Sequence, residues 1–315
     1  MKQAHPYFTG QSPQEKADNR LRRRGAQAAI GVAFVLISAK FAAYLVTGSV
    51  SVMTSLMDST FDALASTVTL LGIVHATTPA DADHRYGHGK IEALSAMAQA
   101  LFIFGSAGYL FFEAMRRFID PQPVQAPGVA IVVMLFSIVA TFVLMAYQRH
   151  VISRTGSVAI AGDMLHYKGD MLMNLGVLAA VCLTYWGNWP YYDPLFAVGI
   201  SVLILYNACG VAKSSLVILL DRELPDEDRA EIERLVMTHP SVKSMHDLRT
   251  RHSGQQAFIE FHLEMDGSIT LDRAHTITEE VEAIIYKAFP RAEVLIHQEP
   301  AGIIDNRLDV MIAKD

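Results

Sequence analysis

Six long apolar stretches fill the first two-thirds of the chain, and short polar segments separate them. They run over 27–47, 51–76, 92–115, 127–147, 158–187 and 194–213. A helix that spans a bilayer needs about 20 predominantly apolar residues, so each stretch is long enough to cross. We predict a membrane all-α domain, a six-helix transmembrane bundle over 25–213, preceded by a polar N-terminal segment over 1–24.

The pattern changes after residue 213 to the shorter elements of an α+β domain. Helical spacing of apolar residues covers 226–238 and 271–289, and strand-like segments cover 242–251, 255–265 and 292–299. This αββαβ order predicts one three-stranded sheet covered by two helices, in a domain over 214–299. Residues 300–315 are predicted to form an irregular tail.

Composition and charge agree with this division. Hydrophobic residues make up 51% of the 315 residues and charged residues 18%, whereas soluble domains carry about 25% charged residues. From Asp221 onward the chain has 20 of its 32 acidic and 11 of its 26 basic residues, so that part has net charge −9 and the rest +3. The pattern excludes one homogeneous soluble domain and a basic nucleic-acid binder.

Basic residues predict the orientation in the membrane, because they favour the cytoplasmic side. They concentrate in the N-terminal segment, in the 77–91 and 148–157 loops and at the start of the tail. These four segments share one side if six spans are present, so both termini are predicted to be cytoplasmic. Lys40 lies inside the first span, and we interpret it as a side chain that snorkels to the outer face.

Two spans carry ionisable residues in their apolar interior. The second contains Asp58 and Asp62, and the fifth contains Asp163, His166 and Asp170. A carboxylate near the centre of a bilayer costs about 2.5–3.5 kcal/mol on insertion scales, so a functional role is the first interpretation. Positions i and i+4 lie on one helix face, so Asp58 and Asp62 point the same way, and so do His166 and Asp170.

Depth predicts that the two pairs meet. At about 1.5 Å per residue, Asp62 is level with His166, and Asp58 with Asp170, which gives a tetrahedral set of three carboxylates and one imidazole. Such donors suit Zn²⁺, with Fe²⁺, Cd²⁺, Co²⁺ or Mn²⁺ as alternatives. The alternative is a polar helix–helix contact between protonated carboxyl groups. Asp163 could guide cations inward or be an interfacial acid.

The loop after the second span holds another potential metal site. Asp81, His84 and His88 are spaced i, i+3, i+7 and can close on one ion if the loop coils, with Asp83 as the alternative carboxylate. Histidines also occur in solvated basic loops, so spacing alone leaves both interpretations open.

The tail is rich in histidine. Strand alternation puts His297 and Glu299 on one face of the last strand, and it puts His262 on the face opposite Ile259 and Phe261. A chelating surface on the solvent side of the sheet is therefore plausible. His239 and His252 are interpreted as ordinary surface residues.

At these residues the chain resembles the cation diffusion facilitator family, specifically its bacterial zinc and ferrous-iron efflux branch. The likeness covers nearly the whole chain, and its most specific segments are Asp163-Met-Leu-His-Tyr-Lys-Gly-Asp170 and Tyr86-Gly-His-Gly-Lys90. It implies a homodimeric transporter in the bacterial inner membrane with a metallochaperone-like cytoplasmic domain. This transporter would export a cytosolic divalent metal in exchange for protons by alternating access. It would be no enzyme and need no nucleotide.

The resemblance also implies roles for individual residues. It makes Asp58, Asp62, His166 and Asp170 the transport site. Dedicated zinc members often have His at the position of Asp58, whereas the broader-range branch has Asp there, like this chain. It implies a second site of Asp81, His84 and His88, and a pairing of Lys90 with Asp221. In the tail it implies a binuclear metal site whose histidine ligands are His246, His262, His275 and His297. Gln298 would be an outer-shell contact of this site. Glu299 stands where the branch usually has Asp.

Two other functional classes compete with a transporter. An intramembrane aspartyl protease also places acids within spans, but the i, i+4 pairs with a histidine favour metal binding. A metal-regulated channel or a sensor is the other alternative, and a pure sensor would not need ligands at mid-membrane.

Overall fold

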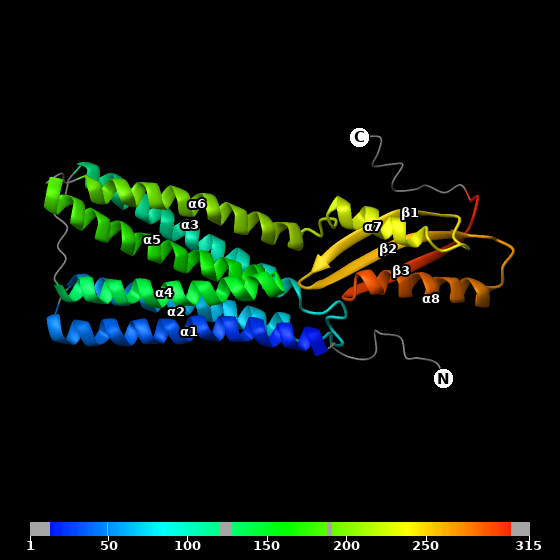
Figure 1. The fold of residues 1–315 in the computed structure, drawn as a ribbon, viewed down its shortest axis with the longest axis horizontal. Coiled ribbons are helices and arrows are strands. Elements are labelled where there is room, and N and C mark those ends of the chain that lie inside the picture. The colour runs from blue at the N-terminus through cyan, green and yellow to red at the C-terminus, as the bar shows by residue number, and fades with distance from the viewer. Residues whose placement is uncertain (1–12, 49, 120–127, 188–190, 304–315) are drawn as a thin grey trace. The chain divides into compact units, whose positions relative to one another are not determined.

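The computed structural model of the protein describes residues 13–48, 50–119, 128–187 and 191–303. It divides into two compact units, with the boundary between Leu216 and Val217. The first unit is helical and the second is a sheet with helices (Figure 1). The first residues of the predicted N-terminal segment and most of the predicted irregular tail lie outside the described residues.

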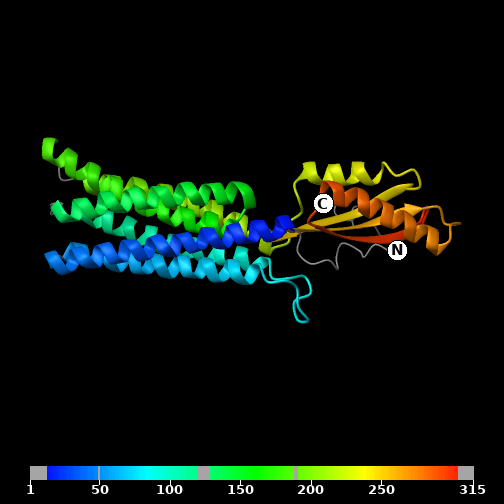
Figure 2. The same cartoon turned by 60° about the horizontal axis from the view of Figure 1, so that its bottom comes forward.

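All six predicted spans form helices, which lie side by side along the first unit (Figures 1 and 2). Their bounds are α1 Pro13–Thr47, α2 Val50–Ala76, α3 Lys90–Ile119, α4 Gly128–Thr155, α5 Val158–Gly187 and α6 Tyr192–Leu219. Over the described residues, five of them are long and apolar enough to cross a membrane. The sixth, α5, is 30 residues long and is the helix that carries Asp163, His166 and Asp170.

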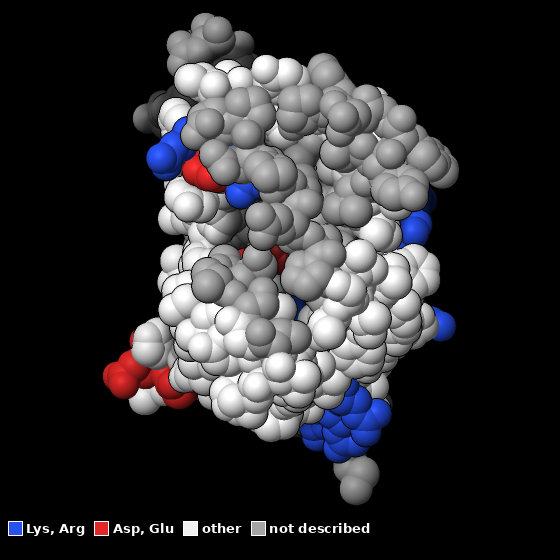
Figure 3. All heavy atoms as spheres, turned by 90° about the vertical axis from the view of Figure 1, so that its left-hand side faces the viewer, with Lys and Arg blue, Asp and Glu red and all other residues white. Residues whose placement is uncertain are grey.

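The outside of the bundle is apolar, as lipid contact requires. Large hydrophobic side chains such as Phe34, Phe112 and Tyr206 are each at least 70% exposed. Figure 3 looks onto the end of the bundle at the left of Figure 1, and most of the described atoms there belong to uncharged residues. The membrane-spanning unit therefore turns its hydrophobic residues outward as well as inward.

Helix α5 lies at the centre of the packing in the bundle. Three clusters of buried residues each include one or two of its side chains, namely Ala159 with Ile160, Leu165, and Tyr167. The cluster of Ala159 and Ile160 joins α5 to α1, α2 and α4. The cluster of Leu165 joins it to α3 and α6, and that of Tyr167 joins it to α1 and α4. On its α6 side, a Cβ atom added at Gly169 would lie 3.0 Å from Ile204 Cδ1, and one added at Gly176 would lie 2.8 Å from Ile200 Cδ1. Glycine thus lets α6 approach closely.

Helix α1 begins fourteen residues before the predicted span (Pro13 against 27), because its polar first turns are anchored. Arg22 is buried and pairs with the buried Glu92 of α3 at 2.5 Å. Asn19 accepts a further hydrogen bond from Arg22, and Ser157 donates to Glu92. This network satisfies charges that would otherwise be costly to bury.

The second unit has the predicted αββαβ order. Its elements are α7 Asp226–Val236, β1 Ser244–Ser253, β2 Gln256–Met265, α8 Leu271–Ala288 and β3 Ala292–Pro300. Three acids in the first turn of α7 favour its N-terminus. At the start of α8, the side chain of Thr270 accepts a hydrogen bond from the Arg273 N–H.

The three strands form one sheet in the order β1-β2-β3. β1 and β2 are antiparallel, and β2 and β3 are parallel and connected through α8. The pairing of β1 with β2 is interrupted between His246 and Arg249, where Asp247 has a positive φ of 51°. The register sets His246 opposite His262, and His262 opposite His297.

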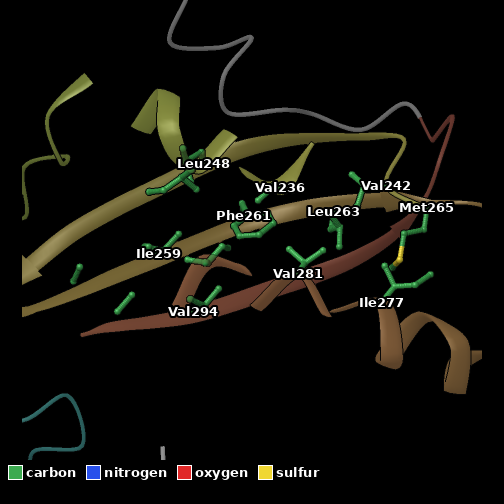
Figure 4. Packing of buried hydrophobic residues seen from close by; sticks show 14 of the residues in the cluster. Val236, Val242, Leu248, Ile259, Phe261, Leu263, Met265, Ile277, Val281 and Val294 are labelled. Atoms are coloured by element: carbon green, nitrogen blue, oxygen red, sulfur yellow. The ribbon is translucent and has the colours of Figure 1, made fainter. Parts of the chain in front are cut away.

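A hydrophobic core joins one face of the sheet to both helices (Figure 4). Ile259, Phe261 and Leu263 of β2 are buried next to Ile277 and Val281 of α8. The intervening His262 is only partly buried, as the predicted alternation requires. The core therefore fixes which face of the sheet is left for the histidines.

Candidate metal centres

The first centre lies between α2 and α5, and we call Asp62, His166 and Asp170 the mid-bundle cluster. One ligand atom from each of them lies within 4.8 Å of the others. His166 Nε2 is 2.8 Å from Asp62 Oδ1 and 3.8 Å from Asp170 Oδ2. The contact of Asp62 with His166 agrees with the depth calculated from the sequence.

The surroundings of the mid-bundle cluster orient its imidazole. His166 is buried, and the edge of its ring meets the ring of Phe102 on α3, with centroids 5.6 Å apart. Asp170 Oδ2 is buried and, among the described residues, accepts no hydrogen bond. A buried acceptor that points at a histidine and a second carboxylate is a ready ligand for a cation.

Asp58, the fourth predicted ligand, is not brought into this cluster. It is exposed, and it does not belong to the group of close ligand atoms formed by Asp62, His166 and Asp170. The i, i+4 spacing places it on the same face of α2 as Asp62, one turn away.

Asp163 lies in the interior of the bundle, which excludes one of the two interpretations from the sequence. It is fully buried, so it is not an interfacial acid. Ser66 donates a hydrogen bond to its Oδ1 at 2.8 Å, and Gln148 donates one to its Oδ2 at 2.7 Å. Both oxygens are occupied by neutral donors from α2 and α4, so Asp163 connects helices within the bundle.

The second centre, which we call the loop cluster, contains Asp81, His84 and His88, the three residues that the resemblance implies. Asp81 Oδ1 is 3.3 Å from His84 Nδ1, and Asp81 Oδ2 is 3.4 Å from His88 Nε2. The His84 backbone N–H donates to Asp81 Oδ1 at 2.7 Å, and this bond lowers the pKa of Asp81 below its ordinary value. Asp83 contributes its backbone N–H to the same oxygen.

The third centre lies on the sheet, and we call His246, His262 and Glu299 the sheet cluster. Glu299 Oε1 is 2.7 Å from His262 Nδ1, and its Oε2 is 3.5 Å from His246 Nε2. His297 lies beside them, with its Nε2 3.4 Å from Glu299 Oε1. Glu299 thus already bridges three histidines with its two oxygens.

Two residues that the resemblance places in the tail site have other partners in this structure. His275 of α8 is exposed and pairs with Glu279 at 3.4 Å. Gln298 donates to Thr278 of α8 at 2.9 Å. Among the described residues, His275 is not part of the group of close ligand atoms on the sheet, and the binuclear site stays a prediction.

Sequence reasoning missed one carboxylate at the sheet cluster. Glu264 Oε1 is 3.1 Å from His246 Nδ1, and both residues are buried. The alternation along β2 puts Glu264 on the same face as His262, so the signal was present. His239 is another correction: it is buried, not an ordinary surface residue, and its Nε2 is 2.8 Å from Glu280 of α8.

Lys90 and Asp221 belong to the two different units, and their pairing stays a prediction. Lys90 is the first residue of α3. Asp221 has a positive φ of 54° directly after α6 and pairs with Arg251 of β1 at 3.7 Å.

Comparison with known proteins gives matches along most of the chain. A model described as the cation efflux transmembrane domain matches residues 26–220, and a model of the cation efflux protein cytoplasmic domain matches residues 224–301. The cation-efflux pump FieF of Klebsiella pneumoniae subsp. pneumoniae is 44% identical over 285 residues, which are 90% of this chain and 95% of that protein. The FieF pump of Escherichia coli has the same identity and coverage.

Among solved structures, the metal-bound C-terminal domain of the CzcD transporter from Thermotoga maritima is 30% identical. It covers 25% of this chain and 93% of its own, with a TM-score of 0.24. The two family models match both units of this protein, and the relatives match over most of their own length. The chain belongs to the cation efflux, or cation diffusion facilitator, family of membrane transporters.

Proposed function

We propose that this protein exports a divalent metal ion from the cytosol in exchange for protons, with Zn²⁺ as the first candidate and Fe²⁺, Cd²⁺, Co²⁺ or Mn²⁺ as alternatives. The observation that carries the proposal is the mid-bundle cluster, in which Asp62, His166 and Asp170 converge inside a membrane-spanning bundle. One nitrogen and carboxylate oxygens suit a borderline divalent ion. Asp58, one turn from Asp62, would complete four ligands.

The same residues supply the coupling to protons. Metal ligands must be deprotonated, so an arriving ion releases protons and arriving protons release the ion. His166 is already hydrogen-bonded to Asp62, so protonation of the imidazole favours the Asp62 contact over a metal. In alternating access, metal would bind from the cytosolic side, and protons entering from the other side would displace it.

The loop and sheet clusters would bind metal on the cytosolic side of a homodimer in the bacterial inner membrane, with both termini cytosolic. The sheet cluster gathers two histidines and a glutamate in a part of the chain that carries a net negative charge. Such a site would accumulate the ion near the bundle or report its concentration to it. His275 and Gln298 would join it only after a rearrangement or from a second protomer.

Transport by reconstituted protein tests the proposal. Purified protein in proteoliposomes should move Zn²⁺ at a rate that follows the imposed pH gradient, and Asp62→Ala combined with Asp170→Ala should abolish this movement. Glu113→Ala is the matched control, because Glu113 is an acid of α3 paired with Arg117 outside the mid-bundle cluster. Transport that ignores the pH gradient, or that survives the double substitution, would exclude the proposed mechanism.

A further inference from the structure

Lys40 does not snorkel to the outer face of the membrane, contrary to the interpretation from the sequence. Only 7% of its surface is exposed. Its Nζ donates a hydrogen bond to the backbone oxygen of Ser55 at 3.1 Å and another to Ser59 Oγ at 2.7 Å. Both acceptors belong to α2, so the ammonium group of α1 is fixed to the helix that carries Asp58 and Asp62.

The position of Lys40 matches the depth of the candidate ligands. It lies seven residues before the end of α1, and Asp58 lies eight residues after the start of α2. At about 1.5 Å per residue, both are roughly 11–12 Å from the same end of the bundle. Ser59, which accepts the shorter hydrogen bond from Lys40, directly follows Asp58 on α2, so the ammonium group lies beside the turn that carries this carboxylate.

The hydrogen bonds of Lys40 leave its charge available to the candidate carboxylate ligands. Ser55 O and Ser59 Oγ are neutral acceptors, and they satisfy two of the three ammonium donors without cancelling the charge. A buried cation acts over a longer range than an exposed one, because the surrounding medium screens it little. Lys40 is therefore placed to oppose carboxylate charge rather than to neutralise one particular residue.

Counting charges shows what this cation does for a bound ion. With Asp58 as the proposed fourth ligand, the carboxylates of Asp58, Asp62 and Asp170 carry −3, and Lys40 reduces the sum to −2. A divalent ion with a neutral imidazole then brings the set to zero, whereas a monovalent ion leaves it at −1. Asp163 lies outside the cluster, with Ser66 and Gln148 on its two oxygens.

We propose that Lys40 is a fixed countercharge of the mid-bundle metal site. A bound divalent ion then brings the net charge of the ligands and Lys40 to zero, so the loaded carrier reorients without moving net charge across the membrane potential. The inference rests on the proposed function, since it assumes that a metal binds there. Lys40 would thereby favour ions of charge +2, and it would also limit how tightly they are held.

Exchange of metal for metal isolates this step, because only the loaded site has to reorient. Proteoliposomes with saturating Zn²⁺ on both sides and no pH gradient would be clamped at defined membrane potentials. In the wild type the exchange rate should change little with potential. In Lys40→Gln it should change by about a further threefold for every 100 mV. A unit charge that crossed the whole field would give up to about fifty-fold. The same variant should lower the KM for Zn²⁺ by about tenfold, because a repelling charge is gone.

Matched variants separate charge from structure. Lys40→Arg keeps the charge, and Ser59→Ala removes one acceptor but leaves the lysine, so both should keep the wild-type dependence on potential. Ser59→Asp adds a carboxylate beside Lys40 and should act in the same direction as Lys40→Gln, which preserves the test if Lys40→Gln does not fold.

Three outcomes would overturn the inference. The first is the same dependence on potential in the wild type, Lys40→Gln and Ser59→Asp. The second is a Lys40→Arg variant that behaves like Lys40→Gln. The third is a higher KM for Zn²⁺ in Lys40→Gln than in the wild type. Absence of any metal exchange in the wild type would instead contradict the proposed function.

Discussion

The mid-bundle cluster and the sheet cluster use the same ligand types on opposite kinds of scaffold. In the bundle, ligands come from α2 and α5 and are spaced one helical turn apart, inside an apolar environment. On the sheet, His246 and His262 are neighbours across two strands and Glu299 lies on the third. The sheet fixes its ligands through a separate core, whereas the bundle ligands move whenever α2 and α5 move.

This difference assigns the two clusters different tasks. A site between helices can change its geometry when the helices rearrange, as a transport cycle requires. A site on a sheet with its own hydrophobic core holds its geometry and suits sensing or storage. The comparison predicts that damage to the mid-bundle cluster affects turnover, and that damage to the sheet cluster affects affinity or regulation.

The largest effect is expected for His166→Ala. It removes the only nitrogen donor of the mid-bundle cluster, and even outer contacts of a metal site are worth about 10–100-fold, so zinc transport should fall at least a hundredfold. Initial rates in proteoliposomes measure it. His150→Ala is the control, because His150 is an exposed histidine of α4. Comparable rates for both variants would refute the assignment.

A second strong effect is expected in the core of the tail. Phe261→Ala removes a fully buried ring from β2 and should lower the free energy of unfolding of that unit by about 3–5 kcal/mol. Hydrogen exchange of the β2 amides in the intact protein reports the loss. Leu295→Ala should change it little, because Leu295 is 65% exposed. Equal protection in the two variants would show that the sheet depends on something other than this core.

A smaller effect is expected for His262→Ala. Zinc affinity of the sheet cluster should fall at least about tenfold, because even a contact that only supports a ligand is worth about 10–100-fold, whereas transport at saturating zinc should change by less than about threefold. Equilibrium titration and transport assays measure the two quantities. His275→Ala sharpens the comparison: an equal loss of affinity would show that His275 joins the site despite its exposed position in one protomer.

The smallest effect is expected for Glu264→Gln. Its carboxylate lies 3.1 Å from His246 Nδ1, where it supports the imidazole without bridging the other ligands. Loss of the charge should weaken zinc binding to the sheet cluster by about threefold, less than the roughly 10–100-fold usual for carboxylates that orient a metal ligand, because the imidazole of His246 itself stays in place. Titration against Glu260→Gln, an acid of the same strand and face, is the comparison. No difference between the two would remove Glu264 from the site.

The fold and part of the sites followed from local patterns. Apolar length, helical spacing and strand alternation predicted each helix and strand that the structure describes, because these periods are set by backbone geometry. The i, i+4 spacing and the count of residues along two antiparallel helices brought Asp62 to His166. Side-chain placement across elements did not follow, because helix rotation and rotamers depend on packing partners.

Lys40 and Asp58 illustrate this limit. Nothing within the first span shows that Ser55 and Ser59 of α2 accept the ammonium group of Lys40, so snorkelling was the simpler interpretation. Asp58 has the predicted spacing, yet it lies outside the group of close ligand atoms. For Lys40 the deciding contacts come from a different helix.

The glycines of α5 have a consequence for how this protein can change over generations. Ile204 and Ile200 of α6 occupy the space that a side chain at Gly169 or Gly176 would need. A lineage that replaces either glycine needs the facing isoleucine of α6 to shift its terminal methyl group or to be replaced by a smaller residue. Sequence variation in the helix that carries the candidate ligands is thereby tied to variation in a neighbour that carries none of them, and the two helices would be inherited as a matched pair.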